Sequence, residues 1–254
     1  MTPPAPNLST SVSTDRAGLS SDQSREARVV AIVMDGNGRW AEAHGKSVDE
    51  GHRAGARALR RTVEAAIDLG IETLVVYAFS TENLTRPSGE VADLMVLLSE
   101  TIDEELPDLA KQGVRSRFLG RRDRIDPAIQ EQMRALEDET ASLDTLSLWI
   151  AFDYGGRAEI VDAARRLVED GVPAEDVDEA ALAERLYAPE LGEIDLLIRA
   201  SGELRISNFL LWELAYAELV FTDTLWPDFD VDDLRAAVEA YAARQRRFGA
   251  RAAR

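Results

Sequence analysis

The feature that most constrains the fold is the alternation of short, fully apolar segments with amphipathic ones. Residues 29–34 (VVAIVM) and 73–79 (TLVVYAF) are continuous apolar runs, of the kind found in strands that are buried on both faces. Residues 52–69, which lie between them, place apolar side chains along one helical face, and Gly70 follows at the C-cap position. This order of strand, helix and strand predicts an α/β fold with a parallel sheet.

The alternation continues along the chain. It predicts further strands at residues 114–119, 146–152 and 194–199 and a segment ending at 218–222, and further helices from about residue 90, at 127–140, 158–169 and 178–187, and from 232 to about 247. Crossovers between such strands are right-handed and leave helices on both faces of the sheet. The length of 254 residues suits a single domain with tails.

Composition limits the classes of function. The chain has 47 acidic and 29 basic residues, a net charge of -18, which argues against a nucleic-acid binder because phosphate contacts need a basic surface. The absence of cysteine excludes disulfides, thiolate metal sites and cysteine nucleophiles, and two histidines leave little room for a histidine-rich metal site. No apolar run is long enough to span a membrane, so we expect a cytoplasmic protein that can visit a membrane surface.

The two ends differ in composition from the rest. Residues 1–27 are rich in Ser, Thr, Pro and Asp and lack the apolar region of a secretory signal, so we expect a disordered N-terminal tail. The domain is expected to span residues 28–249, with a short C-terminal tail at 250–254. The last residues (RQRRFGARAAR) form the one strongly basic run, and such a run is usually a solvated helix end.

Ligands of parallel sheets bind beyond the carboxyl ends of the strands, so the residues that follow each strand are the first candidates for a site. These segments are residues 35–39 (DGNGR), 80–83 (STEN) with Arg86, 153–157 (DYGGR) and 199–207 (RASGELRIS). A net-acidic chain therefore concentrates Arg and Gly at one edge of its sheet. This pattern predicts an anion-binding site there.

The segment MDGNGRW allows two interpretations. Asn-Gly after an apolar run can form a hairpin turn, but RWAEAHGK follows it, and this segment lacks the alternation of a second strand. The favoured interpretation is a strand-to-helix turn whose glycines let backbone N–H groups converge on an anion. Asp35 would repel that anion unless a cation lay between them, which suggests Mg²⁺ bridging Asp35 and phosphate oxygens. The alternative role for Asp35 is a helix N-cap.

A second anion site is predicted around Arg199, Arg205 and Ser207. Two guanidinium groups bind phosphate oxygens in bidentate fashion, and a serine adds a hydroxyl donor. The alternative is a pair of surface arginines bound to Glu203 or Glu213. Two anion sites at one sheet edge suggest an enzyme that holds two phosphorylated substrates side by side.

His52, in EGHRAG, is expected to begin a helix. By itself, a histidine at such a position is most often a capping or surface residue. The two neighbouring anion sites favour a functional role for this one.

Taken together, the motifs MDGNGRWA, GHRAG, YAFSTENLTRP, YGGRAEI, IRASGELRISNFLLWELAYAEL, FTDTLWPDF and RQRRFG, in this order, resemble those of the cis-prenyltransferases. The resemblance covers about residues 28–249. It implies six mostly parallel strands flanked by helices, an apolar prenyl tunnel and a homodimer. It also implies Mg²⁺-dependent condensation of isopentenyl diphosphate with an allylic diphosphate to give a Z double bond, with a peripheral membrane contact for release of the lipid product.

The resemblance assigns roles to individual residues. The allylic diphosphate is expected on Gly36, Asn37, Gly38 and Arg39, with Asp35 holding Mg²⁺, Arg86 and His52 near the diphosphate, and Trp40 near the prenyl chain. Isopentenyl diphosphate is expected on Arg199, Arg205 and Ser207, with Ser80 and Asn83 near the reacting centre and Glu218 assisting Mg²⁺. Arg247 and Gly249 would reach across the dimer. Asp35, Asn83 and His52 are the predicted catalytic residues, and either Asp35 or the departing diphosphate takes the proton.

Four positions depart from the family pattern. Val29 stands in place of His, Leu84 in place of Trp, Asp153 in place of Asn, and Leu204 in place of His or Gln. None removes an arginine or a predicted Mg²⁺ ligand, so we expect activity to survive. The shape of the pocket is what these departures put in doubt.

Product length depends on the tunnel. Phe152 stands where small residues are common, so its ring can floor the tunnel, although ordinary core packing explains it equally well. Ala56 and Ala78 are small and favour a longer tunnel. We therefore expect a medium or long polyprenyl diphosphate, the precursor of a lipid carrier. The alternatives are a short-chain synthase and a non-catalytic partner subunit of the same family. A nucleotide-binding protein would need Gly-x-Gly-x-x-Gly or Gly-Lys-Ser/Thr after the first strand, and neither occurs.

Overall fold

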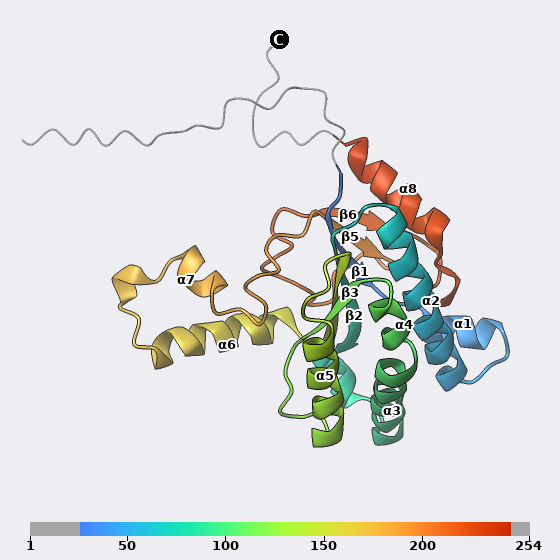
Figure 1. The fold of residues 1–254 in the computed structure, drawn as a ribbon, viewed down its shortest axis with the longest axis horizontal. Coiled ribbons are helices and arrows are strands. Elements are labelled where there is room, and N and C mark those ends of the chain that lie inside the picture. The colour runs from blue at the N-terminus through green and yellow to red at the C-terminus, as the bar shows by residue number, and fades with distance from the viewer. Residues whose placement is uncertain (1–25, 245–254) are drawn as a thin grey trace, which may run out of the picture.

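Every apolar run predicted as a strand enters one parallel sheet in the computed structural model, which describes residues 26–244 (Figure 1). The strands are β1 (Val29–Val33), β2 (Thr73–Ser80), β3 (Val114–Leu119), β4 (Leu146–Tyr154), β5 (Leu196–Arg199) and β6 (Glu218–Phe221). Their order is β3-β4-β2-β1-β5-β6, and each neighbouring pair is parallel. The predicted α/β fold with six parallel strands is confirmed.

Helices fill the connections between the strands. The α-helices are α1 (Asn37–Ala43), α2 (Val48–Asp68), α3 (Ser88–Glu104), α4 (Leu106–Ala110), α5 (Pro127–Glu139), α6 (Gly156–Glu169), α7 (Glu179–Ala183) and α8 (Val231–Ala242). Short 3-10 turns form η1 (Thr81–Thr85), η2 (Ala174–Asp176) and η3 (Trp226–Asp228). Within residues 26–244, no helix combines the length and the apolar character needed to cross a bilayer.

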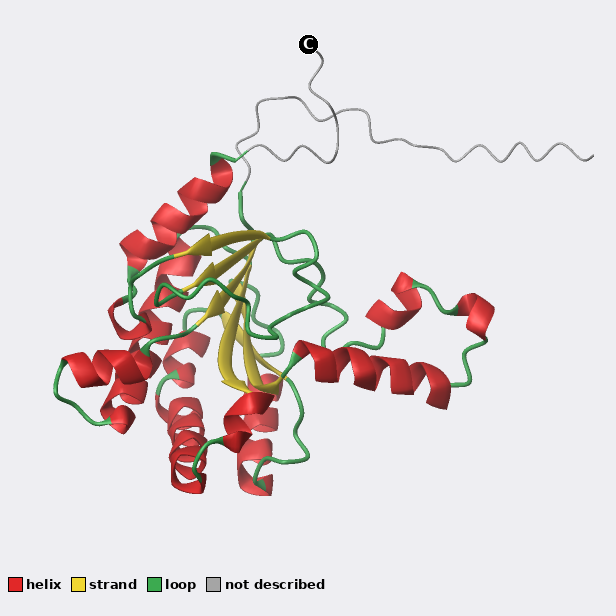
Figure 2. Cartoon of the chain, turned by 180° about the vertical axis from the view of Figure 1, so that it is seen from behind, coloured by secondary structure: helices red, strands yellow, loops and turns green. Residues whose placement is uncertain are grey.

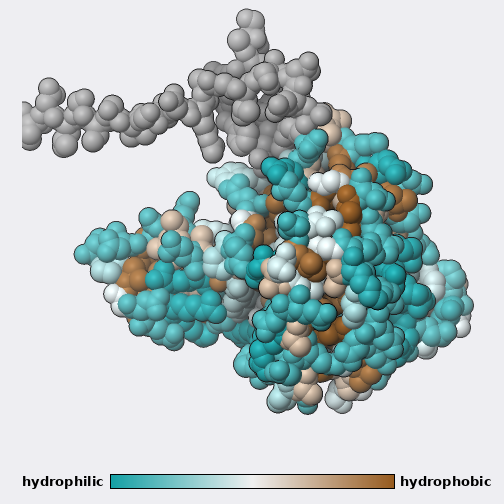
Figure 3. All heavy atoms as spheres, viewed as in Figure 1, coloured by the Kyte–Doolittle hydropathy of each residue, from teal (hydrophilic) through white to brown (hydrophobic). Residues whose placement is uncertain are grey.

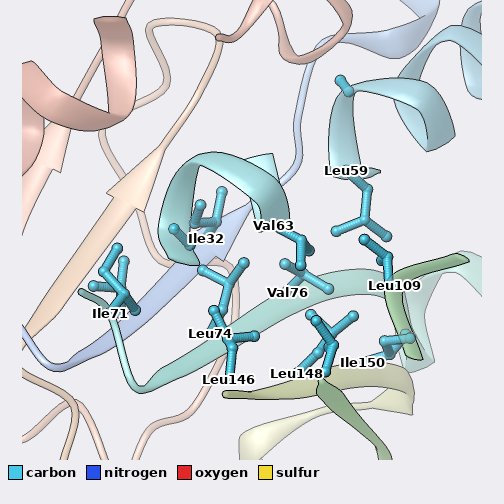
Figure 4. Packing of buried hydrophobic residues seen from close by; sticks show 14 of the residues in the cluster. Ile32, Leu59, Val63, Ile71, Leu74, Val76, Leu109, Leu146, Leu148 and Ile150 are labelled. Atoms are coloured by element: carbon cyan, nitrogen blue, oxygen red, sulfur yellow. The ribbon is translucent and has the colours of Figure 1, made fainter. Parts of the chain in front are cut away.

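The two faces of the sheet are covered differently. On one face, helices α2, α3, α4, α5 and α8 pack against the strands, and Ile32, Leu74 and Leu148 are completely buried beneath them (Figure 4). On the other face the covering residues come mainly from irregular segments at 187–194 and 206–217, and α6 and α7 project away from the sheet (Figure 2). The expectation of helices on both faces is therefore met fully on only one.

The second helix begins earlier than the sequence suggested. Ser47 and Glu50 form a capping box, in which the Ser47 hydroxyl accepts the Glu50 N–H and the Glu50 carboxylate accepts the Ser47 N–H. Helix α2 therefore starts at Val48. His52 consequently lies in the second turn, and the expectation that it begins the helix is wrong.

The domain also begins slightly earlier than composition indicated. Ala27, assigned to the tail from its composition, is buried against the core. Residues 1–25 and 245–254 lie outside the described residues, and with them most of the predicted N-terminal tail, the C-terminal tail and the RRFG segment. The surface in Figure 3 is largely hydrophilic, in keeping with the net charge of -18.

Candidate active site

A cleft of about 820 Å³ opens at the carboxyl edge of the sheet, where the sequence predicted a site. Residues from five separate segments line it: the end of β1 with the β1–α1 turn, α2, the end of β2 with η1, α3, and the end of β5 with the stretch that follows it. The predicted site residues on its wall are Asp35, Gly36, Asn37, Gly38, Arg39, His52, Ser80, Asn83, Arg86, Arg199, Arg205 and Ser207. The fold thus brings both predicted anion sites into one cleft.

The β1–α1 turn has the conformation that its glycines suggested. Gly36 is the N-cap of α1 with a φ of 108°, a left-handed value that favours glycine. A Cβ there would also lie 2.9 Å from Leu225 Cδ2. Strand β1 is followed by a helix, so the hairpin interpretation is wrong. Asp35 precedes the cap and makes no cap hydrogen bond, so the N-cap interpretation of Asp35 is wrong as well.

The GHRAG motif holds α1 against α2. A Cβ on Gly51 would lie 2.4 Å from the Asn37 carbonyl oxygen, and one on Gly55 would lie 2.5 Å from Asn37 Oδ1. Only glycines at these two positions, one turn apart on α2, let the start of α1 approach so closely. The contact brings Asn37 Nδ2 to 3.3 Å from His52 Nδ1.

His52 is half-buried at this junction. Burial lowers the pKa of the imidazole, and the positive charge of Arg86 lowers it further. The neutral imidazole is therefore favoured at neutral pH. A neutral ring can accept or donate a hydrogen bond at the cleft without adding charge.

Arg199 is the centre of the second anion site and is only 3% exposed. Its Nη2 donates to Asp35 Oδ2 at 2.9 Å, and its Nη1 donates to Ser207 Oγ at 2.7 Å and to the Arg205 carbonyl. The surface-pair alternative is therefore wrong for Arg199. For Arg205 both interpretations hold: it is exposed and pairs with Glu203, as the surface-pair alternative expects, and it also lines the cleft.

Asp35 is held in its charged form. Burial alone would raise the pKa of its carboxyl group, but hydrogen bonds from Arg199 and Ser201 and the charges of Arg199 and Arg39 outweigh burial and lower it. Arg39 Nη2 lies 3.4 Å from Asp35 Oδ1 and also donates to Ser201 Oγ at 2.6 Å. An ionised carboxylate between two guanidinium groups is thus available on the cleft wall.

The carboxylate chemistry suits Mg²⁺ only in part. Among residues 26–244 no cluster of three or more His, Asp or Glu side chains could hold a metal ion. Mg²⁺ commonly takes one or two protein carboxylates and completes its shell with water and substrate phosphates. Asp35 by itself supplies the single carboxylate that such a Mg²⁺ site requires.

Two predicted residues lie away from the cleft. Glu218 begins β6 and pairs with Leu196 at the start of β5, so it lies at the amino edge of the sheet, where Arg244 Nη1 is 3.4 Å from its carboxylate. Parallel strands place their two ends at opposite edges, so within this chain Glu218 cannot join Asp35 at a metal ion. The sequence-based assignment of Glu218 to the site is therefore wrong for a single chain.

Trp40 is the second of these residues. It does not line the cleft, and it donates from Nε1 to Asp228 Oδ1 at 2.7 Å and stacks on His44. Trp40 lines neither the cleft nor the apolar pocket beside it, whereas Trp226, which the sequence reasoning missed, lines that pocket. Trp226 is buried, donates to the Gly55 carbonyl at 2.9 Å and lines an apolar pocket. The LWPDF motif was the available signal for it.

That apolar pocket adjoins the cleft between α2, α3 and the sheet. It shares Met34, Asn37, His52, Ala78, Phe79 and Leu94 with the cleft, and Ala56, Leu59, Leu97, Leu98, Leu106, Ile150, Phe152 and Trp226 complete most of its wall. Phe152 stacks on Phe79 with ring centroids 4.9 Å apart. A polar cleft that continues into an apolar pocket can hold an amphipathic ligand with a charged head.

The four departures from the family pattern do not line the cleft. Val29 begins β1, Leu84 packs against the core, and Leu204 is exposed to solvent. Asp153 is buried at the end of β4, where its carboxylate pairs with Arg124. None of residues 153–157 lines the cleft, so the DYGGR segment is not part of this anion site.

Comparisons with known proteins identify the family of the chain. The sequence profile of the family described as "Putative undecaprenyl diphosphate synthase" matches residues 33–249. The chain is 46% identical over 220 residues to an isoprenyl transferase of Fusobacterium nucleatum, covering 87% of this chain and 94% of the relative. It is 48% identical over 226 residues to the ditrans,polycis-undecaprenyl-diphosphate synthase ((2E,6E)-farnesyl-diphosphate specific) of Escherichia coli K12, covering 87% and 89% of the two chains.

A solved structure is similar in fold and sequence. The lavandulyl diphosphate synthase of Lavandula x intermedia, in complex with dimethylallyl diphosphate, superposes with a TM-score of 0.84 at 34% identity, covering 88% of this chain and 98% of that one. The profile and the relatives together span nearly the whole described domain. This chain therefore belongs to the cis-prenyltransferase family and is a prenyltransferase.

Proposed function

We propose that this prenyltransferase condenses isopentenyl diphosphate with an allylic diphosphate primer, in a Mg²⁺-dependent reaction, to give Z-prenyl diphosphates of medium or long chain. The observation that carries the proposal is the position of Arg199, which joins Asp35 on the β1–α1 side of the cleft to Ser207 on the β5 side. Two diphosphates bound on the two sides would meet across this arginine. Farnesyl diphosphate is the proposed primer, because the E. coli relative is named as specific for it.

In this proposal the allylic diphosphate binds beside residues 36–39 and Arg86, and its prenyl chain enters the apolar pocket. Ionisation of the allylic C–O bond places negative charge on the departing diphosphate. Arg39 and Arg86 line the cleft where that charge develops, and preorganised donors of this kind usually supply the largest part of catalysis. A Mg²⁺ ion held by Asp35 would add Lewis-acid stabilisation of the same charge.

Isopentenyl diphosphate binds on the Arg199, Arg205 and Ser207 side, and its double bond attacks the allylic carbon. A proton then leaves the new chain. Asp35 is a weak base because its pKa is lowered by Arg199, Ser201 and Arg39, despite the opposing effect of burial. This favours the departing diphosphate as the proton acceptor. Ser80 and Asn83, which form a capping box at η1, orient this end of the cleft.

The proposal includes a homodimer and a peripheral membrane contact through which the lipid product leaves. A second copy of the chain offers one way to bring a Glu218 carboxylate or the RRFG segment to the site. The apolar pocket has a volume of about 90 Å³, less than the ~150 Å³ of a cavity that accommodates benzene. Residues around it must therefore move to admit a chain of several isoprene units.

The test uses the purified full chain with Mg²⁺, labelled isopentenyl diphosphate and one of three primers: dimethylallyl, geranyl or farnesyl diphosphate. We expect Z-prenyl diphosphates with farnesyl diphosphate as the best primer, and loss of turnover when a chelator removes Mg²⁺. Absence of product with every primer would refute the proposed reaction and favour a non-catalytic partner subunit. Short products only would refute the long-chain part alone.

A further inference from the structure

The chain that follows β5 has an unusual backbone. Ser201, Ser207, Asn208 and Leu210 all have positive φ angles, of 80°, 52°, 60° and 43°. Residues other than glycine adopt this region of backbone conformation at a free-energy cost, and the conformation persists only where the surrounding structure stabilises it. Asn tolerates the left-handed region better than Ser or Leu. Hydrogen bonds between Asn208 and two other segments hold this stretch of the chain.

Asn208 caps helix α6 from a distant part of the sequence. The N-cap residue of α6, Gly155, provides no side-chain hydrogen bond. Instead the Asn208 carbonyl accepts the Gly156 N–H at 2.7 Å, and Asn208 Oδ1 accepts the Arg157 N–H at 2.9 Å. Two of the N–H groups that a helix start leaves unpaired are thus satisfied by one residue.

The paired glycines of YGGR make room for this contact. A Cβ on Gly155 would lie 2.9 Å from Asn208 Nδ2 and 2.6 Å from Thr81 Oγ1. A Cβ on Gly156 would lie 2.7 Å from Leu211 Cγ. The first amides of α6, which the sequence offered as part of an anion site, are therefore occupied by Asn208.

The third polar group of Asn208 reaches the opposite wall of the cleft. Its Nδ2 donates to Glu82 Oε1 at 2.9 Å. Glu82 belongs to η1, the turn that carries Asn83 and lies between Ser80 and Arg86. Asn208 therefore connects the segment after β5 to the segment after β2 and to α6.

Ser207, the neighbour of Asn208, is part of the Arg199 site. Its hydroxyl accepts from Arg199 Nη1 at 2.7 Å, and its carbonyl lies 3.5 Å from the Tyr77 hydroxyl. Ser207 and Asn208 are consecutive, so the cap that Asn208 forms on α6 also constrains the backbone that carries Ser207. This backbone places the Ser207 hydroxyl against Arg199.

We propose that Asn208 is a positioning residue for the isopentenyl diphosphate side of the cleft: through its cap on α6 and its bond to Glu82 it holds Ser207 and Arg199 in the geometry that binds diphosphate. This inference rests on the proposed function, since it names the half-site that Asn208 serves. Asn208 acts through Ser207 and Arg199 and needs no contact with substrate.

The main test compares Asn208→Gly with the unmodified chain. Glycine keeps the left-handed backbone accessible and removes both side-chain hydrogen bonds, so it separates the bonds from the strain. We expect the KM for isopentenyl diphosphate to rise about tenfold or more, with the KM for farnesyl diphosphate changed less than about twofold. An equal rise in both KM values, or no rise, would overturn the inference.

A second pair of variants tests the bond to Glu82. Asn208→Asp keeps the acceptor for Arg157 but places a carboxylate against Glu82, so its KM for isopentenyl diphosphate should exceed that of the unmodified chain. Adding Glu82→Gln restores a donor between the two positions and should recover most of the affinity. A purely structural role would raise and restore the KM values of both substrates together, so absence of a rescue that is selective for isopentenyl diphosphate would also overturn the inference.

The failure of the inference can be distinguished from that of the proposed function. If the unmodified chain makes no product from isopentenyl diphosphate and any primer, the proposed function fails and the inference with it. If the unmodified chain is active and the variants show no selective KM effect, the inference alone fails. Thermal unfolding of every variant shows whether each retains its fold, and the rescue by Glu82→Gln remains decisive where Asn208→Gly is destabilised.

Discussion

Arg199 and Asp35 form an ion pair, with Nη2 2.9 Å from Oδ2, although the two residues are 164 positions apart in sequence. They lie at the carboxyl ends of the adjacent strands β5 and β1. The pair joins the turn after β1 to the segment after β5, and it lies on the wall of the cleft. Because Arg199 is buried and Asp35 is partly exposed, Asp35 is the member that presents its carboxylate to a bound cation. Substitutions at this site and in the core around it test the roles proposed for these residues.

Asp35→Asn should lower kcat by about three orders of magnitude, because the amide keeps the shape of the side chain but removes the charge proposed to hold Mg²⁺. Turnover of labelled isopentenyl diphosphate at saturating Mg²⁺ measures this. Thermal unfolding of the same variant is the control, since Arg199 retains its bonds to Ser207 and to the Arg205 carbonyl. Near-normal turnover would refute the role of Asp35.

Gly55→Ala should displace Asn37 from α2, since the new Cβ would lie 2.5 Å from Asn37 Oδ1 and 3.0 Å from Trp226 Cδ1. We expect a loss of about 1–3 kcal/mol of stability from overpacking, together with a fall in kcat of about tenfold. Gly89→Ala in α3 is the matched control, because a Cβ there meets no atom within 4 Å. Equal behaviour of the two variants in denaturant unfolding and turnover would contradict the close-approach argument.

Phe152→Ala should lengthen the product if the ring limits the apolar pocket that it lines with Phe79. The substitution should also cost about 3–5 kcal/mol of stability, because the side chain is buried. Phe118→Ala is the control: Phe118 is equally part of the core but does not line the pocket. Chromatography of the products decides the question, and an unchanged length in Phe152→Ala assigns the ring to ordinary packing.

Glu213 should make the stability of the fold depend on pH. Among the described residues, neither of its buried carboxylate oxygens has a hydrogen-bond partner, and burial together with the nearby Glu159 charge raises its pKa to about 8. The folded state therefore binds a proton that the unfolded state releases near its ordinary pKa. The stabilising effect is complete below the ordinary pKa of a glutamate and is lost as pH rises through the raised pKa of Glu213.

Glu213→Gln should remove much of this dependence and stabilise the protein at pH 8, as measured by denaturant unfolding between pH 5 and 9. Glu193→Gln, at an exposed position, is the control and should leave the pH profile unchanged. An identical pH profile for Glu213→Gln and the unmodified chain would show that Glu213 is charged in the folded state.

Local patterns predicted the strands well. Runs such as 73–79 and 146–152 are largely apolar on both faces because their strands lie inside the sheet, and the observed strands extend only one or two residues beyond them. The helix starts were less accurate, because a start depends on a few polar side chains. The Ser47 capping box moved the start of α2 from the predicted residue 52 to Val48.

The sequence predicted the site best where a residue lies at the carboxyl end of a strand or just after it. Asp35, Ser80 and Arg199 lie at the carboxyl edge because parallel strands bring these ends together. The prediction for Glu218 failed because this residue lies at the amino end of a strand, although the family motif assigned it to the site. Trp40 was singled out and Trp226 was not, because both belong to motifs and only the packing shows that Trp226 is buried at the apolar pocket.

Local periodicity and the order of the segments along the chain were enough to predict the fold class, the sheet edge that carries the cleft and most of the charged groups on its wall. The long-range partners of each group became visible only in the folded chain. The pairing of Arg199 with Asp35, the room that Gly55 leaves for Asn37, and the cap that Asn208 places on α6 each join residues from different elements of the fold. Such contacts depend on how the elements pack, and no local pattern of residues encodes them.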